Sequence, residues 1–204
     1  MGRRKEGTKK GIVLLVEGDT EKTFYTRLIQ YLQDKNSTKK RIEKLHIVNL
    51  KGVGNYGNKG PNKFKNEICR DNPDVEYNVF CAYDMDVFQS AFIYAMKPPV
   101  DWKIVEKALR KHGALQVFHL KAFYMIEDWF LVDLEGLCKF LEIDVVQPKG
   151  KNALEKIKNL FRKKNKIYQK GSTDQFISYL SMEKIYTQFY EVLNPLETCL
   201  FAEN

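Results

Sequence analysis

The sequence lacks the marks of several protein classes. It contains four cysteines, none in a C-x-x-C pair, and three scattered histidines, so we expect reduced thiols and no zinc site. No run of about 18 apolar residues could form a membrane span. The basic N-terminus leads into an apolar run too short for a signal peptide. These absences predict a cytoplasmic protein without a membrane segment.

Acidic residues are also in short supply, with 26 Asp and Glu against 34 Lys and Arg, for a formal net charge of +8. The excess is concentrated in residues 149–170, which hold nine Lys or Arg and one Glu, and in the tail of residues 1–10. Clustered cations are typical of proteins that contact phosphate backbones, so we expect RNA or DNA as a partner, with Lys163 and Lys164 among the contacts. The alternative is a set of lysine-rich helices that are simply well solvated.

Short β-rich runs alternate with helical patterns over the first two thirds of the chain. The runs cover residues 12–16, 46–50, 77–83 and 115–120, and the helices between them residues 19–33, 61–71 and 101–112. This alternation predicts an α/β fold with a mostly parallel four-stranded sheet flanked by helices. After residue 124 only helical patterns follow, at residues 125–142, 151–164 and 174–193.

We therefore expect three parts. Residues 1–10 form a basic tail and residues 11–145 an α/β domain. Residues 146–204 form a basic helical extension packed on that domain.

Acidic side chains follow two of the expected strands. Glu17 comes directly after the first strand, and Asp84 and Asp86 follow the third. Open α/β sheets bind ligands at the carboxyl ends of their strands, where these three carboxylates would converge. Close carboxylates repel one another unless a cation lies among them, and a hard ion such as Mg²⁺ prefers oxygen ligands. The pattern predicts a metal site, although an isolated D-x-D is more often a solvated turn or cap.

A fourth acid, Glu127, lies within the apolar stripe of the expected helix 125–142, in line with Leu131, Leu134 and Cys138. A carboxylate on a face that packs against the core is costly unless it is paired or bound to a cation. Two interpretations stay open. One is a salt bridge to a buried Arg or Lys, and the other is a metal ligand or general base.

Residues 51–60 form a loop with four glycines that could present backbone N–H groups to phosphate. The loop lacks the G-x-x-x-x-G-K-[ST] pattern, so it predicts no ATP hydrolysis, and it could equally be an ordinary mobile connection. Lys51, Lys59 and Lys121 are candidates for contacting substrate phosphate. Among aromatic residues that could stack on bases, Tyr56 is the favoured candidate, whereas Trp129 is expected in the core. Phe123, Tyr124 and Tyr168 complete that set.

Three segments together resemble a known fold family. V-E-G-D-T-E-x-x-F-Y at 16–25, Y-D-M-D at 83–86 and M-I-E-D-W-F-L-V-D at 125–133 are similar to the motifs of the TOPRIM (topoisomerase–primase) fold. The closest resemblance is to its stand-alone branch, related to OLD-family nucleases and RloB-like proteins. It covers about residues 11–135, with Glu17 and Asp84 67 residues apart.

The resemblance implies Mg²⁺-dependent phosphodiester chemistry, with Mn²⁺ as a substitute. Glu17, Asp84 and Asp86 would be the metal and catalytic residues, and Glu127 would match the acid of the third motif. The expected function is a nuclease acting on RNA, tRNA included, or on DNA, as an effector of bacterial or phage defence. The alternative is a non-catalytic binding module that works with a separate ATPase. Nucleotidyl transfer of the primase type ranks last. A homodimer is compatible with either function.

Overall fold

The four strands form one parallel sheet in a computed structural model that describes residues 9–201. Its spatial order is β2-β1-β3-β4, and the strands are β1 (Lys9–Val16), β2 (Lys44–Asn49), β3 (Val75–Asp84) and β4 (Ala114–Ala122). The predicted fold class is therefore confirmed. Most of the basic tail predicted for residues 1–10 lies outside the described residues, while Lys9 and Lys10 begin β1.

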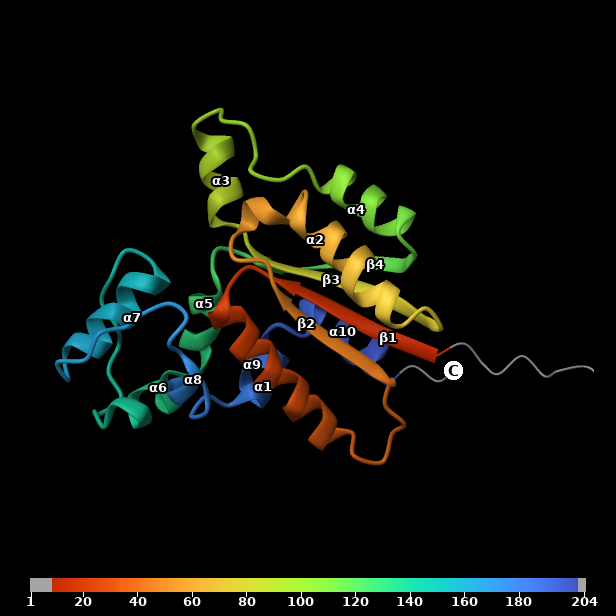
Figure 1. The fold of residues 1–204 in the computed structure, drawn as a ribbon. Coiled ribbons are helices and arrows are strands. Elements are labelled where there is room, and N and C mark those ends of the chain that lie inside the picture. The colour runs from red at the N-terminus through yellow and green to blue at the C-terminus, as the bar shows by residue number, and fades with distance from the viewer. Residues whose placement is uncertain (1–8, 202–204) are drawn as a thin grey trace, which may run out of the picture.

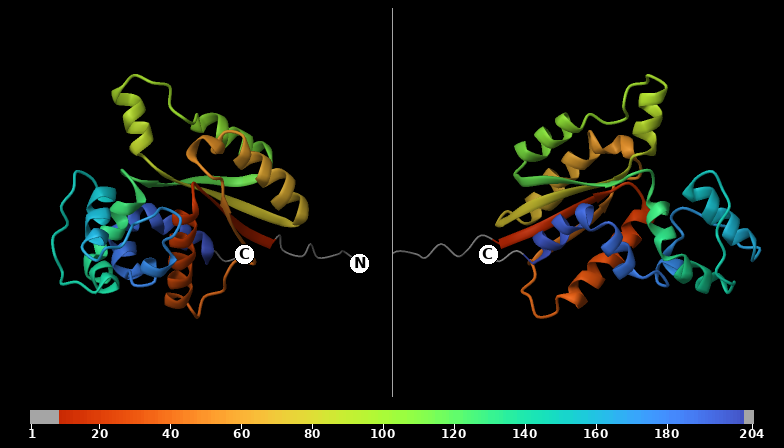
Figure 2. Two further views of the ribbon diagram at one scale, coloured as in Figure 1. Left: turned by 60° about the vertical axis from the view of Figure 1, so that its left-hand side comes forward. Right: turned by 180° about the vertical axis from the view of Figure 1, so that it is seen from behind.

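The central strands are buried on both faces, as the apolar run 12–16 predicted. Along β1, Ile12 and Leu14 belong to one hydrophobic cluster, whereas Val13 and Leu15 belong to another. Side chains alternate between the two faces of a strand, so a sheet covered on both sides needs apolar residues at successive positions. The sheet is thus the middle layer of three (Figures 1 and 2).

Helices from different parts of the chain cover the two faces. On one face lie α2 (Lys59–Lys63), the π-helical turn Phe64–Cys69 and α4 (Trp102–Lys111). On the other face lie α1 (Asp19–Lys35) and α10 (Tyr190–Leu200), as Figure 2 shows from behind. A group of shorter helices lies on the α1 side of the molecule (Figure 1). They are α5 (Ile126–Phe130), α6 (Leu134–Leu141), α7 (Ala153–Arg162), α8 (Asp174–Ile177) and α9 (Met182–Gln188).

The C-terminal helices share the core of the sheet and are not a separate layer on its surface. Leu193 and Leu196 of α10 pack in the same cluster as Ile12 and Leu14 of β1. The backbone N–H of Ile42 donates to the carbonyl oxygen of Leu200 at 3.0 Å, which ties the end of α10 to the chain entering β2. In the part of the chain that the structure describes, no helix is long and apolar enough to cross a membrane.

Two predicted helices differ from the observed ones, and one observed helix was not predicted. Residues 125–142 form α5, a 3-10 turn (Leu131–Asp133) and α6, because Asp133 turns inward to accept hydrogen bonds from Ser181 N–H and Lys184 Nζ. Residues 174–193 form α8, α9 and the first part of α10. No helix was predicted between the strand 77–83 and the helix 101–112, yet this stretch contains α3 (Asp86–Ile93), which stands out from the sheet at its carboxyl end (Figure 1).

Candidate active site at the carboxyl end of the sheet

The sheet topology brings Glu17 and Asp84 together. Because β1 and β3 are neighbours with Val16 opposite Ala82, the residues that end these strands lie side by side. The backbone N–H of Asp84 donates to Glu17 Oε1 at 3.0 Å. Both side chains line a cleft of about 350 Å³, which we call the acid cleft, together with Glu21, Asn49, Lys51 and Lys170. The sequence prediction that these two acids share one site agrees with this geometry.

Burial makes the carboxyl groups of this cleft weak acids. The pKa of Asp84 is raised to about 9, mainly by removal from water and next by the nearby Glu21, against the opposing effect of Lys170. The pKa of Glu17 rises to about 7 for the same main reason, although the hydrogen bond from Asp84 N–H lowers it. Burial also raises the pKa of Glu21. The cleft therefore concentrates carboxylates whose charge is unfavourable without a cation.

Glu127 lies behind the cleft, fully buried at 0% exposure. Its Oε1 accepts a hydrogen bond from the Tyr168 hydroxyl at 3.0 Å and lies 3.4 Å from Lys170 Nζ. Its Oε2 has no hydrogen-bond partner among the described residues. The contact with Lys170 corresponds to the ion pair that the sequence left open as one of two interpretations.

Lys170 is the residue that sequence reasoning missed. Its Nζ lies 3.4 Å from Glu127 Oε1 and 3.9 Å from Asp84 Oδ2, with about half of the side chain exposed to the cleft. Burial lowers the pKa of Lys170, but the carboxylates of Glu127 and Asp84 outweigh that effect and raise it. The next residue, Gly171, donates its N–H to Thr20 Oγ1 at 2.8 Å, which holds this segment against the start of α1. Lys170 is one of nine cations in a basic block, so no local pattern distinguishes it.

Asp86 takes a different position from the one predicted. It begins α3, and its Oδ1 accepts the N–H of Val87 at 2.7 Å. Its side chain lines a neighbouring groove, and not the acid cleft. Among residues 9–201, no three His, Cys, Asp or Glu side chains converge closely enough to hold a metal ion as they stand. The three-carboxylate metal site of Glu17, Asp84 and Asp86 thus stays a prediction.

The side chains that line the acid cleft carry the kind of ligand atom that a hard divalent cation prefers. Glu17, Glu21 and Asp84 offer carboxylate oxygens, and Asn49 adds an amide at the end of β2, so no soft sulfur or nitrogen ligand lines this part of the cleft. The unpaired Glu127 Oε2 marks a further oxygen close by. In the arrangement seen, the ammonium of Lys170 supplies the positive charge that these oxygens need.

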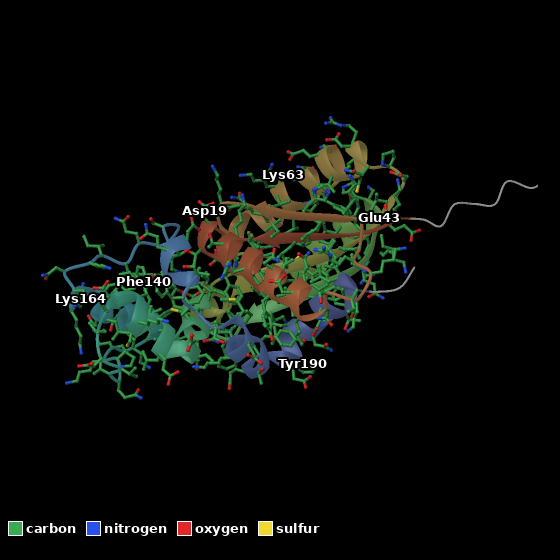
Figure 3. The ribbon with its side chains drawn as sticks, turned by 90° about the horizontal axis from the view of Figure 1, so that it is seen from below. Asp19, Glu43, Lys63, Phe140, Lys164 and Tyr190 are labelled. Atoms are coloured by element: carbon green, nitrogen blue, oxygen red, sulfur yellow. The ribbon has the colours of Figure 1, made fainter. Side chains whose placement is uncertain are left out.

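The predicted phosphate-binding lysines are spread over different surfaces. Lys51 lines the acid cleft, held in a left-handed conformation (φ 61°) by the hydrogen bond from its N–H to Asn49 Oδ1. Lys59 instead donates to the carbonyl oxygen of Leu50 at 3.2 Å, and Lys121 is exposed on β4. Lys163 and Lys164 are exposed beyond α7, and Figure 3 shows Lys164 at the outer tip of the molecule, far from Asp19.

The base-stacking prediction for Tyr56 is wrong. Its ring is fully buried, packed edge-on against Trp102 with centroids 5.1 Å apart. Its hydroxyl is hydrogen-bonded with the carbonyl oxygens of Leu15 and Ala82, so the residue anchors the glycine-rich loop to the sheet. A tyrosine in a glycine-rich loop suggested an exposed ring, whereas this ring packs against Tyr83 and Trp102. Trp129 is buried as predicted, and Phe123 and Tyr124 are the exposed rings.

The raised pKa values predict how stability depends on pH. Below about pH 4, Asp84 and Glu17 are protonated in both the folded and the unfolded chain. As pH rises toward 9, the unfolded chain releases these protons while the folded one retains them, so folding becomes less favourable. We expect the free energy of unfolding of the metal-free protein to fall by ~3 kcal/mol between pH 5 and pH 9. For a chain of this length, that loss lowers the melting temperature by roughly 6–12 °C.

Differential scanning calorimetry in EDTA, on the wild type and on Asp84→Asn, measures this effect. The variant keeps the acceptor for Ile126 N–H but cannot ionise, so its melting temperature should fall much less. Equal pH profiles for the two proteins would show that Asp84 titrates normally.

The chain was also compared with known proteins. No family model, no curated protein and no solved structure matches it.

Proposed function

We propose that this chain is a Mg²⁺-dependent nuclease that hydrolyses phosphodiester bonds in RNA or DNA. The observation that carries the proposal is the acid cleft itself. Glu17 and Asp84 lie at the carboxyl ends of two adjacent parallel strands, and Glu21 in the first turn of α1 lines the same cleft, as do Lys170 and Lys51. Anionic oxygens next to ammonium groups are what a metal-assisted reaction on a phosphate needs. The formal net charge of +8 agrees with a polyanionic substrate.

The residues of the cleft would divide the work. Glu17 and Asp84 would hold the metal with Glu21, which lines the same cleft, whereas Asp86 would have to turn out of its own groove to join them. Mn²⁺ should substitute for Mg²⁺. When bound, the ion would act as a Lewis acid toward the phosphodiester oxygens. Glu17 Oε1 already accepts the N–H of Asp84, so its proton belongs on Oε2. With a pKa of about 7 in the metal-free cleft, Glu17 can give up that proton near neutral pH when the ion binds.

The two lysines have the complementary task. Lys170 reaches the cleft from the chain between α7 and α8, and Lys51 reaches it from the loop after β2. Their ammonium groups would bind substrate phosphate and oppose the charge that builds up on its oxygens. Glu127 would hold the Lys170 side chain in place, because Glu127 Oε1 lies 3.4 Å from the Lys170 ammonium. We therefore assign Glu127 a positioning role.

One observation favours a second function. Lys170 already neutralises Asp84 and Glu127, and no three-acid metal site is assembled among residues 9–201. A cleft that is satisfied without a metal suits a non-catalytic module that binds nucleic acid or a partner such as a separate ATPase. The roles in cytoplasmic antiviral defence and in tRNA cleavage rest on the TOPRIM resemblance alone.

Incubation of the purified protein with total RNA and with plasmid DNA, with Mg²⁺ or with EDTA, separates the two functions. The nuclease proposal predicts new ends in one of the substrates only when Mg²⁺ is present. Binding of the same substrates without any Mg²⁺-dependent cleavage would support the non-catalytic module. Sequencing of the new ends would then define the preferred substrate.

A further inference from the structure

A second groove is lined by Asp86, two residues after Asp84 of the acid cleft. Its volume is about 560 Å³, and its walls include Ile93 of α3, Tyr124 after β4, and Lys151 and Lys156 at the start of α7. We call it the α3–α7 groove. The N–H of Asp86 donates to the carbonyl oxygen of Tyr124 at 2.9 Å, which fixes the first turn of α3 beside that residue. Figure 1 shows α3 and α7 on opposite sides of the carboxyl end of the sheet.

Two aromatic rings are exposed in and beside this groove, because Tyr124 lines it and Phe123 precedes Tyr124 in the chain. Phe123 is 70% exposed and Tyr124 50%, and their rings meet edge to face with centroids 4.7 Å apart. Their backbone is held in place, because Gln89 Nε2 donates to the carbonyl oxygen of Phe123 at 2.8 Å. On the opposite wall, Ile93 is 71% exposed. Apolar side chains gathered in one exposed place usually mark a binding surface.

Two lysines and two carboxylates line the groove, so its attraction for a phosphate chain comes from the α7 side, where the basic block 149–170 begins. The carboxylates are those of Asp86 and Asp128, and each accepts a backbone N–H of its own helix start, from Val87 at 2.7 Å and from Met125 at 3.1 Å. Lys151 and Lys156 add two ammonium groups on the α7 side, at the head of the basic block 149–170. Exposed rings beside lysines form the combination that binds unpaired bases and their backbone together.

We propose that the α3–α7 groove binds single-stranded nucleic acid and leads it to the acid cleft. This inference rests on the proposed nuclease function and names its substrate class. In a duplex the bases are stacked inside, so they cannot cover Phe123 and Tyr124, whereas a single strand presents a base face to each ring. A protein partner could cover Ile93 and the rings. It would not account for the two lysines or for the place of Asp86, two residues after Asp84, in the wall of the groove.

Fluorescence anisotropy in EDTA tests the proposal without cleavage. The probes are a labelled 20-nucleotide RNA, the DNA of the same sequence, and the two corresponding duplexes. The variants are Tyr124→Ala, Phe123→Ala and the pair Lys151→Gln with Lys156→Gln. The controls are Tyr190→Ala, on α10 and exposed, and Lys111→Gln, at the end of α4 just before β4 begins, at the other end of that strand from Phe123 and Tyr124. Circular dichroism checks that each variant folds.

We expect tighter binding of at least one single strand than of its duplex. Each ring variant should weaken single-strand binding about 10-fold, and duplex binding less than about 2-fold, because only unpaired bases stack on the rings. The lysine pair should lower the slope of log affinity against log salt by about 1.4 for a single strand. The controls should bind as the wild type does. A preference for RNA over DNA would identify contacts to the 2′-hydroxyl.

Two results would overturn the inference. The first is equal or tighter binding of duplexes, with no loss in the ring variants. The second is self-association, seen by sedimentation velocity, that the ring variants abolish while nucleic-acid binding is unchanged, since the groove would then be a protein interface. Failure of the nuclease proposal looks different, because strand binding in EDTA would persist without any cleavage in Mg²⁺.

Discussion

Asp84→Asn should reduce nucleic-acid cleavage by about 10³-fold or more, which corresponds to ~4 kcal/mol of transition-state stabilisation. Asp84 is 6% exposed and ends β3 in the acid cleft, where its Oδ1 accepts the N–H of Ile126 at 2.8 Å. The amide oxygen of asparagine can keep that hydrogen bond, so the backbone should stay in place. What is lost is the negative charge, which a divalent cation or a proton would otherwise neutralise.

Glu17→Gln should give a loss of the same order, because its Oε1 accepts the Asp84 N–H in the same cleft and an amide oxygen can replace it. The matched control is Asp144→Asn, which removes one carboxylate from an exposed loop. Initial cleavage rates in Mg²⁺ give the result, and melting temperatures show whether each variant is folded. Full activity in both cleft variants would mean that the catalytic centre lies elsewhere.

Lys170→Met should cause the second large effect. This change keeps most of the apolar stem and removes the ammonium that lies 3.4 Å from Glu127 Oε1. Glu127 is fully buried, so its carboxylate would be left with the Tyr168 hydroxyl as its remaining partner. Loss of one partner from a buried pair costs up to 3–5 kcal/mol. Because Lys170 is half exposed, we expect about 1–3 kcal/mol at pH 7, together with reduced cleavage.

Urea denaturation of four proteins measures the interaction energy between Lys170 and Glu127. These are the wild type, Lys170→Met, Glu127→Gln and the double variant, with Lys163→Met as a control for loss of an exposed lysine. The double variant should be more stable than the sum of the single losses predicts, because no buried charge is then left unpaired. Lys170→Arg should retain most of the stability. If Lys170→Met unfolds at the same urea concentration as the wild type, the ammonium does not stabilise Glu127.

The strands could be predicted because a strand that is buried on both faces has apolar side chains at successive positions. The run at 12–16 is apolar on both faces, and Glu17 and Gly18 mark its end. The observed β1 starts earlier, at Lys9, because the first two residues of the strand are exposed or half-buried and so can be polar, which no apolar pattern detects. The joining of Glu17 with Asp84 also depended on strand order. Alternating strands and helices imply parallel pairing, but only the structure shows that β1 and β3 are neighbours.

Other features could not be predicted for physical reasons. α3 has no amphipathic stripe facing the core, because Phe92 and Ile93 are exposed to solvent, so periodicity could not detect it. Lys170 acquires its role from contacts with residues 43 and 86 positions away, which no local pattern encodes. Tyr56 was misassigned because its neighbours are polar and small, although its ring is buried by residues distant in the chain.

A titration with Mn²⁺, followed by electron paramagnetic resonance of the free ion, tests the central claim most directly. It compares the wild type with Asp84→Asn at pH 7.5, with no nucleic acid present. The account predicts saturable binding to the wild type that Asp84→Asn weakens at least about 10-fold, or ~1.4 kcal/mol. A wild-type protein that binds nucleic acid but shows no saturable Mn²⁺ binding would contradict it, and would make the acid cleft a site satisfied by Lys170 alone.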